Sequence, residues 1–322
     1  FNAFVFMEIS SLSSYVLISL GRDRRALFAS YQYLVLGTIG ATFFVIAIGL
    51  LYIATGTLNM ADLAERLPAL SSNTVVIAAY AFLIVGLSLK LALFPLHLWL
   101  PNAYTFAPSV VSALLAGTAT KVGVYLLLRF MFGVFGVDFS IGEHPVAGLL
   151  MPLAMVAAVS CSLVAITQVN VKRLLAYSSL AQIGYIVLGI SLANETGLTG
   201  AVVHLFNHAL MKGAMFIALG CIMLRVGGTD FEHIKGLGKR MPLTMVAFVL
   251  AGLSLIGIPG TVGFVSKWYL VLAALERDLW PIAVIVMITS LMAVVYIWRV
   301  VEAAYFGKLD PSIKIKEAPW PM

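Results

Sequence analysis

Residues 86–129 read GLSLKLALFPLHLWLPNAYTFAPSVVSALLAGTATKVGVYLLLR, and this stretch decides the class of fold. It places Lys90 and Lys121 inside apolar runs long enough to cross a bilayer, and Pro95 interrupts the first run five residues after its lysine. A lysine at the bilayer centre costs roughly 2.5 to 3.5 kcal/mol on insertion scales. Lys90 can snorkel to the interface if it lies near a helix end, whereas Lys121 has more than ten largely uncharged residues on each side. We therefore expect Lys121, and with it Lys90, to serve a function inside a helical bundle.

The composition is that of an integral membrane protein. Hydrophobic residues make up 61% of the 322 residues, charged residues make up 11%, and the mean hydropathy is +1.03. Soluble domains are about 45 to 50% apolar and about 25% charged. The apolar runs have the length of membrane helices, and the sequence lacks the short alternating segments of an outer-membrane barrel. The predicted fold is an all-α, polytopic transmembrane helical bundle.

Nine membrane spans can be drawn, and the loops between them differ in charge. The spans are 1–20, 30–55, 73–100, 108–135, 147–167, 174–193, 199–224, 242–275 and 281–301. One side collects the basic residues Arg22, Arg24, Arg25, Lys172, Arg173, Arg225, Lys235, Lys239, Arg240, Lys308, Lys314 and Lys316. The other side collects Asp62, Glu65, Asp138, Glu143, Glu195, Glu276 and Asp278. By the positive-inside rule the basic side is cytoplasmic, so the net charge of +6 indicates topology rather than nucleic-acid binding.

Glu8 is the only acid placed well within a predicted span, in the segment FNAFVFMEISSLSSYV. A buried carboxylate without a partner is expected to be neutral and to serve packing, whereas a nearby lysine would keep it ionised. We predict that Glu8 and Lys90 lie within about 8 Å of each other or share a chain of waters, because each lowers the cost of the other's charge.

Two spans carry polar residues at helical spacing. His204, His208 and Lys212 follow at i, i+4 and i+8 and climb one helix face over about 12 Å. The preceding span carries a polar stripe of Ser178, Gln182 and Tyr185. Such steps, with Asn207 beside them, can pass protons through waters, and histidine both accepts and releases a proton near neutral pH. A metal site is a poor alternative, because carboxylates and thiolates are absent nearby in sequence.

The span 242–275 repeats the combination of a proline and a lysine. Lys90 precedes Pro95, whereas Lys267 follows Pro259 by eight residues. Broken membrane helices in corresponding positions of two halves point to a transport site, and the reversed order suits an inverted repeat. We expect residues 1–135 and 147–301 to form two related halves. His97 joins the same polar interior or is a hydrogen-bonded structural histidine.

The remaining features concern disulfides, metal sites, cofactors and the ends of the chain. Cys161 and Cys221 lie in apolar runs without metal spacing, so neither a disulfide nor a metal site is predicted. The sequence carries no nucleotide loop, CxxC or haem motif, so we expect no cofactor and no catalytic centre in this chain. Residues 57–72 are expected to form a short external segment and residues 302–322 a cytoplasmic tail. Because residue 1 is a phenylalanine within an apolar run, we expect a piece of a longer chain.

Five motifs in order now resemble a known family. They are FVFMEISSLSSYVL (4–17), KLALFPLHLWLP (90–101), AGTATKVGVYLLLR (116–129), VKRLLAYSSLAQIGY (171–185) and GIPGTVGFVSKWYL (257–270). They are similar to the antiporter-like subunits shared by respiratory complex I, membrane-bound hydrogenases and Mrp-type cation/proton antiporters. The resemblance covers almost the whole chain. It implies a core of fourteen helices, of which this chain would lack the first four and the last.

The resemblance also implies roles for individual residues. Glu8 matches the glutamate of the family's fifth helix, Lys90 the lysine of its broken seventh helix and Lys121 the lysine of its eighth. Lys267 matches the basic residue of the broken twelfth helix, at the expected outlet of the proton path. The linking polar residues of the eleventh helix correspond to His204, His208 and Lys212.

The resemblance leaves two kinds of assembly open. Many complex I relatives carry Pro-Asp-Ala-His where this chain has Pro101, Asn102, Ala103 and Tyr104, which favours the Mrp-type sodium/proton antiporter and its D-type membrane component. The alternative is a proton-pumping subunit of complex I (NADH:quinone oxidoreductase) or of a membrane hydrogenase, powered by electron transfer elsewhere. Either implies partners in the same bilayer, protons and in one case sodium as cargo, and a bacterial cytoplasmic membrane.

Overall fold

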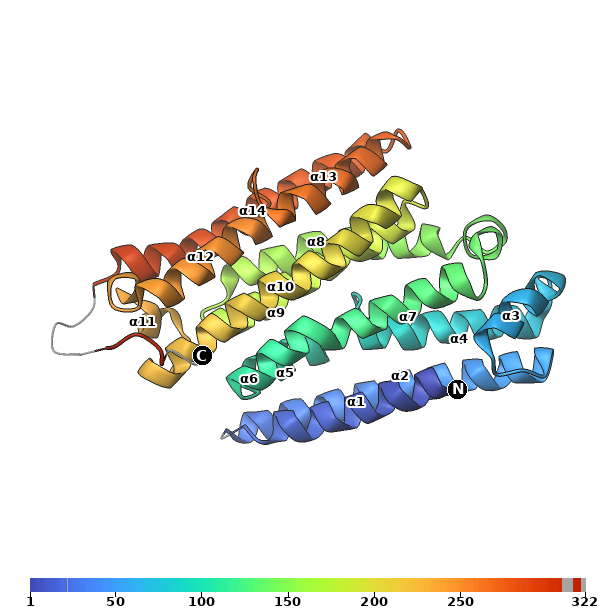
Figure 1. Cartoon of the computed structure of the whole chain (residues 1–322), viewed down its shortest axis with the longest axis horizontal. Coiled ribbons are helices and arrows are strands. Elements are labelled where there is room, and N and C mark those ends of the chain that lie inside the picture. Colours follow the sequence, from blue (N-terminus) through green and yellow to red (C-terminus); the bar gives the residue numbers. More distant parts are fainter. Residues whose placement is uncertain (22, 309–314, 320–322) are drawn as a thin grey trace.

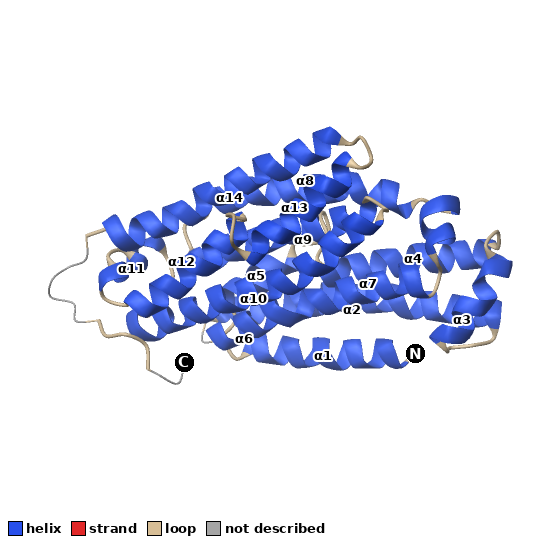
Figure 2. Cartoon of the chain, turned by 45° about the horizontal axis from the view of Figure 1, so that its top comes forward, coloured by secondary structure: helices blue, strands red, loops and turns tan. Residues whose placement is uncertain are grey.

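A computed structural model describes residues 1–21, 23–308 and 315–319, and its regular elements there are all helices (Figure 2). The first group of helices is α1 (Asn2–Ser19), α2 (Arg24–Thr55), α3 (Met60–Arg66), α4 (Thr74–Leu91), α5 (Trp99–Phe106), α6 (Ser109–Leu114) and α7 (Thr120–Gly133). The second group is α8 (Val146–Thr167), α9 (Val171–Ser191), α10 (Glu195–Val226), α11 (Phe231–Ile234), α12 (Pro242–Ile256), α13 (Val262–Leu275) and α14 (Trp280–Phe306). Eight of the described helices, with α6 to α7 counted as one span, have the length and composition to cross a membrane. The predicted all-α, multi-pass membrane bundle is confirmed.

The helix ends follow ordinary capping chemistry. The side chains of Asp23, Asn73 and Asn170 each accept a hydrogen bond from a backbone N–H in the first turn of the helix that they precede. Gly56 and Gly227 end the two longest helices in the left-handed conformation. These caps mark where the membrane-spanning helices begin and end.

Two predicted spans are interrupted near their prolines, as predicted for broken helices. The span 73–100 is helical to Leu91, and the chain turns through residues 92–98 before α5 begins. The span 242–275 is two helices of 15 and 14 residues, separated at residues 257–261. Helix α14 continues to Phe306, and the tail expected from residue 302 stays a prediction. Arg22 and Lys314 of the predicted basic side lie outside the described residues.

The helices form two groups that lie against each other (Figure 1). Helices α1 to α7 make one group and α8 to α14 the other, with α9 buried along nearly its whole length. A Cβ atom on Gly184 of α9 would lie 2.8 Å from the carbonyl oxygen of Ala154 on α8, so this close packing requires glycine. The inverted-repeat relation of the two halves stays a prediction.

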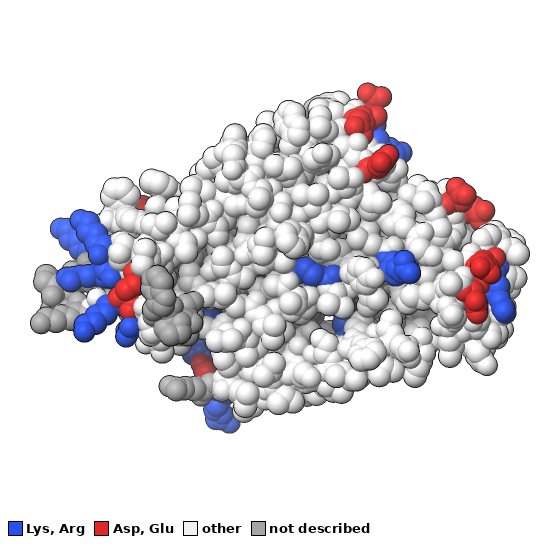
Figure 3. Space-filling view, in the orientation of Figure 1, with Lys and Arg blue, Asp and Glu red and all other residues white. Residues whose placement is uncertain are grey.

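Charge separates along the long axis of the molecule (Figure 3). Most of the visible Lys and Arg atoms gather at one end, and the visible Asp and Glu atoms gather mainly at the other. The broad belt between the two ends is largely uncharged. A few basic atoms also show within that belt. The arrangement agrees with the separation of charge predicted from the loops, and the assignment of the basic end to the cytoplasmic side stays a prediction.

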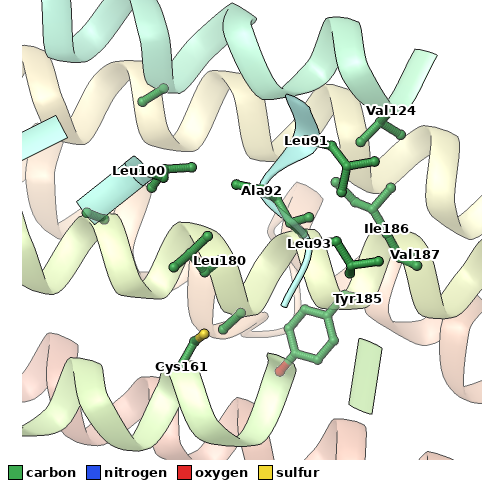
Figure 4. Packing of buried hydrophobic residues seen from close by; sticks show 14 of the residues in the cluster. Leu91, Ala92, Leu93, Leu100, Val124, Cys161, Leu180, Tyr185, Ile186 and Val187 are labelled. Carbon is green, nitrogen blue, oxygen red and sulfur yellow. The ribbon is translucent and has the colours of Figure 1, made fainter. Parts of the chain in front are cut away.

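The break between α4 and α5 lies deep in the bundle. Ala92 adopts a left-handed conformation (φ 59°) and ends α4. The chain that follows, at Leu93, lies beside Tyr185 and Val187 of α9 (Figure 4). The first broken helix therefore meets the second group of helices at its most buried member.

Candidate functional site

Glu8 and Lys90 form an ion pair inside the bundle. The Nζ atom of Lys90 lies 2.8 Å from Oε1 of Glu8, and it also donates a hydrogen bond to the hydroxyl of Ser11. The Lys90 side chain is 6% exposed and that of Glu8 is 21% exposed. The predicted proximity is confirmed, and the alternative of a neutral packing carboxyl without a partner is wrong.

The break in the first broken helix explains where Lys90 sits. Lys90 is in the last turn of α4, where free backbone carbonyls and the helix dipole favour a positive charge. The indole of Trp99, on the far side of the break, donates to the carbonyl of Leu89 at 3.0 Å. Tyr33 of α2 stacks on the same indole at 3.9 Å between ring centroids. The two sides of the break thus hold each other around the lysine.

Lys121 lies at a second irregularity, where residues 115–119 form a turn of π-helix between α6 and α7. Its ammonium donates to the carbonyl of Ala116, a group that the irregular turn leaves available, and it is half-buried. The π-turn packs on α10, since a Cβ on Gly117 would lie 4.0 Å from the carbonyl oxygen of Ala209. Lys121 therefore lies at the contact between the two groups of helices, within electrostatic range of His208 and Lys212.

The predicted polar face of α10 is buried and largely connected. His204 contacts the hydroxyl of Ser266 at 2.8 Å through Nδ1 and the amide oxygen of Gln182 at 3.0 Å through Nε2. The rings of His204 and His208 lie parallel, with centroids 6.1 Å apart. Lys212 donates to the hydroxyl of Ser178 and, at 3.0 Å, to the carbonyl of Leu175. Two residues of the stripe predicted on α9, Ser178 and Gln182, thus bond to the α10 face, whereas the third, Tyr185, donates to the hydroxyl of Thr289 on α14 at 2.7 Å.

His208 occupies the middle of this series and is fully buried. Neither of its ring nitrogens has a hydrogen-bond partner among the described protein atoms. A buried imidazole with two free nitrogens needs a partner, because unpaired buried polar groups are costly. Ordered water, which bridges such groups in protein interiors, fits this position.

Lys267 completes the series near the break in the second broken helix. Its ammonium donates to the carbonyls of Leu255 and Ile256 at 2.9 Å each, at the C-terminal end of α12, and to the hydroxyl of Ser290 at 3.0 Å. It also lies 5.0 Å from the ring centroid of Tyr185. Gly257 has φ 89°, and a Cβ there would come within 3.0 Å of the Lys267 stem.

Both broken helices therefore present a lysine to the C-terminal end of a half-helix. Lys90 does so from the last turn of α4 itself, and Lys267 reaches back to α12 from α13. Their order along the chain differs, and so do the partners of the two ammonium groups: Lys90 meets a carboxylate and a hydroxyl, whereas Lys267 meets two carbonyls and a hydroxyl. A cation there is favoured by the helix dipole. The predicted breaks after Pro95 and near Pro259 thus serve the same electrostatic purpose.

The predicted residues form two clusters and one bridge. The first cluster is the Glu8–Lys90 pair, and the second runs from Lys212 through the histidines to Lys267. Lys121 lies within electrostatic range of the second cluster, and its helix α7 packs on the end of α4, since a Cβ on Gly123 would lie 3.0 Å from the backbone nitrogen of Leu91. His97 is not joined to either cluster by a hydrogen bond among the described residues, and its ring stacks on Phe94 at 5.2 Å. Its role stays open.

The sequence analysis placed one buried group in the wrong setting. Lys172 was assigned to a loop, but it is the second residue of α9, 4% exposed, and donates to the carbonyl of Ala107 at 3.1 Å. The asparagine at position 170, a helix-capping residue, could have shown that the helix starts before Lys172. Among the described residues, no group of three or more potential metal ligands occurs.

Chemically, the site is a row of groups that can hold and release protons. Amines and imidazoles alternate with hydroxyls and an amide, each of which can donate and accept hydrogen bonds. Because burial makes each charge costly, few of these groups are expected to be protonated at the same time. A charge added at either end changes how readily the neighbouring groups bind a proton.

Comparison with known proteins identifies the family. The family described as NADH:quinone oxidoreductase/Mrp antiporter, transmembrane, matches residues 1–293. The chain is 45% identical to the N-type subunit of the NADH-quinone oxidoreductase of Desulforudis audaxviator over 324 aligned residues, which cover 100% of this chain and 64% of that protein. It is 34% identical to the D-type subunit of the Na(+)/H(+) antiporter of Alkalihalophilus pseudofirmus, over 96% of this chain and 62% of that protein.

Solved structures agree. A chain of the archaeal membrane-bound sulfane sulfur reductase, a respiratory membrane complex, superposes with a TM-score of 0.89 at 38% identity, covering 98% of this chain and 63% of its own. A chain of the Mrp complex from Dietzia superposes with a TM-score of 0.89 at 30% identity, covering 98% and 58%. The chain thus spans about three fifths of the length of these relatives. On the match across residues 1–293 and these identities, the chain belongs to the family of antiporter-like membrane subunits shared by NADH:quinone oxidoreductase and Mrp antiporters.

Proposed function

We propose that this chain is a proton-translocating membrane subunit and that its buried lysines, histidines and glutamate carry the protons. The observation that supports the proposal is one buried helix face with two hydrogen-bonded steps, Lys212 to Ser178 and His204 to Gln182. His208 lies between these steps, and Lys267 lies beyond them beside Tyr185. Four lysines of this bundle lie next to other titratable or hydrogen-bonding groups in its interior, and burying each of them is costly. A proton path uses each of them.

The proposed path has two sections. Protons reach Lys121 from the side of the Glu8–Lys90 pair, pass to the α10 series, and leave at Lys267 toward the external face. When Glu8 holds Lys90 charged, Lys121 is disfavoured as an ammonium, because two like charges repel in a medium of low dielectric constant. Separation of the pair would reverse that preference. Waters at His208 would complete the connection to Lys212.

Variants of Lys212 test the path. Lys212→Met removes the titrating group but keeps an unbranched side chain of similar length. In inverted membrane vesicles that contain the assembled complex, we expect proton flux to fall at least tenfold with normal amounts of the protein. Lys308→Met, at an exposed lysine on the cytoplasmic end, is the matched control and should transport normally. Normal flux with Lys212→Met would contradict the proposal.

The finer assignment concerns the assembly. We propose a redox-driven complex of the NADH:quinone oxidoreductase type, supported by the 45% identity to an N-type subunit of that enzyme and the 38% identity to the sulfane sulfur reductase chain. The predicted D-type component of an Mrp antiporter remains the second candidate, favoured by the Pro101–Tyr104 motif and the 34% identity to its antiporter relative.

The energy source that drives proton movement distinguishes these two assemblies. A redox-driven complex translocates protons when its electron donor is added and does so without sodium. An Mrp antiporter moves protons in response to a sodium gradient and ignores the donor. Both assays are done on bacterial cytoplasmic-membrane vesicles with the partner subunits present.

A further inference from the structure

Lys172 is the buried charge that the proposed path does not use. It is 4% exposed and forms no ion pair among the described residues. It lies in the first turn of α9, where the helix dipole disfavours a positive charge. Arg173 follows it on the same helix and adds a second positive charge there. The lysine is therefore held in an unfavourable place.

The single hydrogen bond of Lys172 crosses between the two groups of helices. Its acceptor is the carbonyl of Ala107, in the turn that joins α5 to α6. In the described part of the chain, it is the only hydrogen bond or ion pair that joins residues 1–135 to residues 146–306. A second polar contact, from His144 to the carbonyl of Ser71, involves the connecting loop at the opposite end.

The rest of the interface near this turn is close packing. A Cβ on Gly220 of α10 would lie 3.1 Å from Cβ of Ser109, the first residue of α6. One turn away along α10, the rings of Tyr104 and Phe216 meet edge to face, with centroids 5.7 Å apart. Apolar contacts of this kind have no preferred direction, whereas a hydrogen bond to one carbonyl has a preferred distance and angle and so favours one position.

The turn at Ala107 sets where Lys121 lies. From Ala107 the chain runs through α6 and the π-turn directly to Lys121, and both elements pack on α10. A shift of the turn along α10 would carry the ammonium of Lys121 past His208. We infer that Lys172 is a positioning residue, which ties the α5–α6 turn to α9 and thereby fixes Lys121 opposite the histidines of α10. This inference rests on the proposed proton path for its function, although the tie itself does not.

The effect of Lys172 on the position of the α5–α6 turn can be measured without a transport assay. In a chain with Cys161→Ala and Cys221→Ala, the pair Ser109→Cys and Gly220→Cys places two thiols close to disulfide geometry, for which the Cβ atoms lie about 3.5 to 4.5 Å apart. We expect efficient cross-linking under mild oxidation. Lys172→Met should lower the extent of cross-linking at least threefold, and Lys172→Arg, which keeps a cationic donor, should restore it. Lys308→Met is the control.

Transport then tests the consequence. We expect Lys172→Met to lower proton flux about tenfold at normal assembly and Lys172→Arg to recover most of it, because arginine donates the same hydrogen bond but releases no proton. If both variants lose flux while cross-linking stays normal, Lys172 carries protons itself and the positioning role is wrong. Unchanged cross-linking in Lys172→Met also overturns it.

Two further results distinguish failure of the positioning role from failure of the proposed proton path. If Lys172→Met does not accumulate, Lys172→Gln, with a neutral donor on a shorter stem, should give intermediate cross-linking, and full cross-linking there refutes the tie. If Lys212→Met leaves flux intact, the proposed proton path fails, but loss of cross-linking in Lys172→Met would still support the tie.

Discussion

Separating the Glu8–Lys90 pair gives the sharpest prediction about energetics. Glu8→Gln keeps an acceptor oxygen but leaves the Lys90 ammonium without a counter-charge, at a position that is 6% exposed. Lys90→Met leaves the Glu8 carboxylate without its cation, but at a position that is 21% exposed. The double variant removes both charges and strands neither.

The magnitude follows from the geometry of the pair. Two unit charges 2.8 Å apart attract by about 6 kcal/mol at an effective dielectric constant of about 20. Desolvation offsets several kcal/mol of this, yet removing one partner of a buried pair typically costs about 3 to 5 kcal/mol, because the other charge is left unpaired. We expect Glu8→Gln near the upper end and Lys90→Met near the lower end. The double variant should be at least about 2 kcal/mol more stable than the sum of the single effects predicts.

The assay is a double-mutant cycle on the free energy of unfolding in detergent, with proton flux measured in parallel. All three variants should lose flux, including the double variant of near-normal stability. Additive effects on stability, within about 0.5 kcal/mol, would refute the ion pair as an energetic unit. Full flux in the stable double variant would instead remove the pair from the proton path.

Three further predictions use other parts of the chain. Replacing His208 by leucine should cut proton flux at least tenfold while changing stability by less than about 1 kcal/mol, because neither ring nitrogen has a hydrogen-bond partner in the described part of the chain. A large loss of stability would show that the ring has a structural role. Gly86→Ala should destabilise the α2–α4 contact by about 1 to 3 kcal/mol, since its Cβ would lie 2.8 Å from the carbonyl oxygen of Gly40, whereas Gly49→Ala, with open space around it, should be neutral or stabilising in the same unfolding assay. Burial raises the pKa of Glu317, but hydrogen bonds from Thr244, Ala318 and Leu243 outweigh it and hold the pKa below its usual value. Its contribution to stability should thus be complete above pH 4.5 and disappear as the pH falls through the lowered value, and Thr244→Val should weaken that dependence on pH.

Much of the bundle and of its polar interior was predictable from the sequence. Long apolar runs fix membrane helices, and lysines within them can be placed inside because lipid excludes them. Spacing of four residues put His204, His208 and Lys212 on one face, and the structure buries that face. The pairing of Glu8 with Lys90 followed from charge alone, since each needed a partner that the other could supply.

Other features depend on packing that sequence spacing does not encode. Ala92 ends α4 in a left-handed conformation, although alanine favours helix, because the chain must turn around Lys90. The π-turn before Lys121 contains neither a proline nor a paired glycine that would mark it. Lys267 reaches backwards across its break, which requires knowing where α12 ends. The choice of an Mrp antiporter from Pro101–Tyr104 is not confirmed, because four residues weigh less than identity over the whole chain.

Lys121 is the residue on which the central claim depends most directly, since it is the proposed carrier of the first group of helices that lies at the contact with α10. The decisive measurement is the initial rate of proton flux in vesicles that contain the assembled complex with Lys121→Ala. The account predicts flux below a tenth of the normal rate with the protein present in normal amounts, and unchanged flux would contradict it.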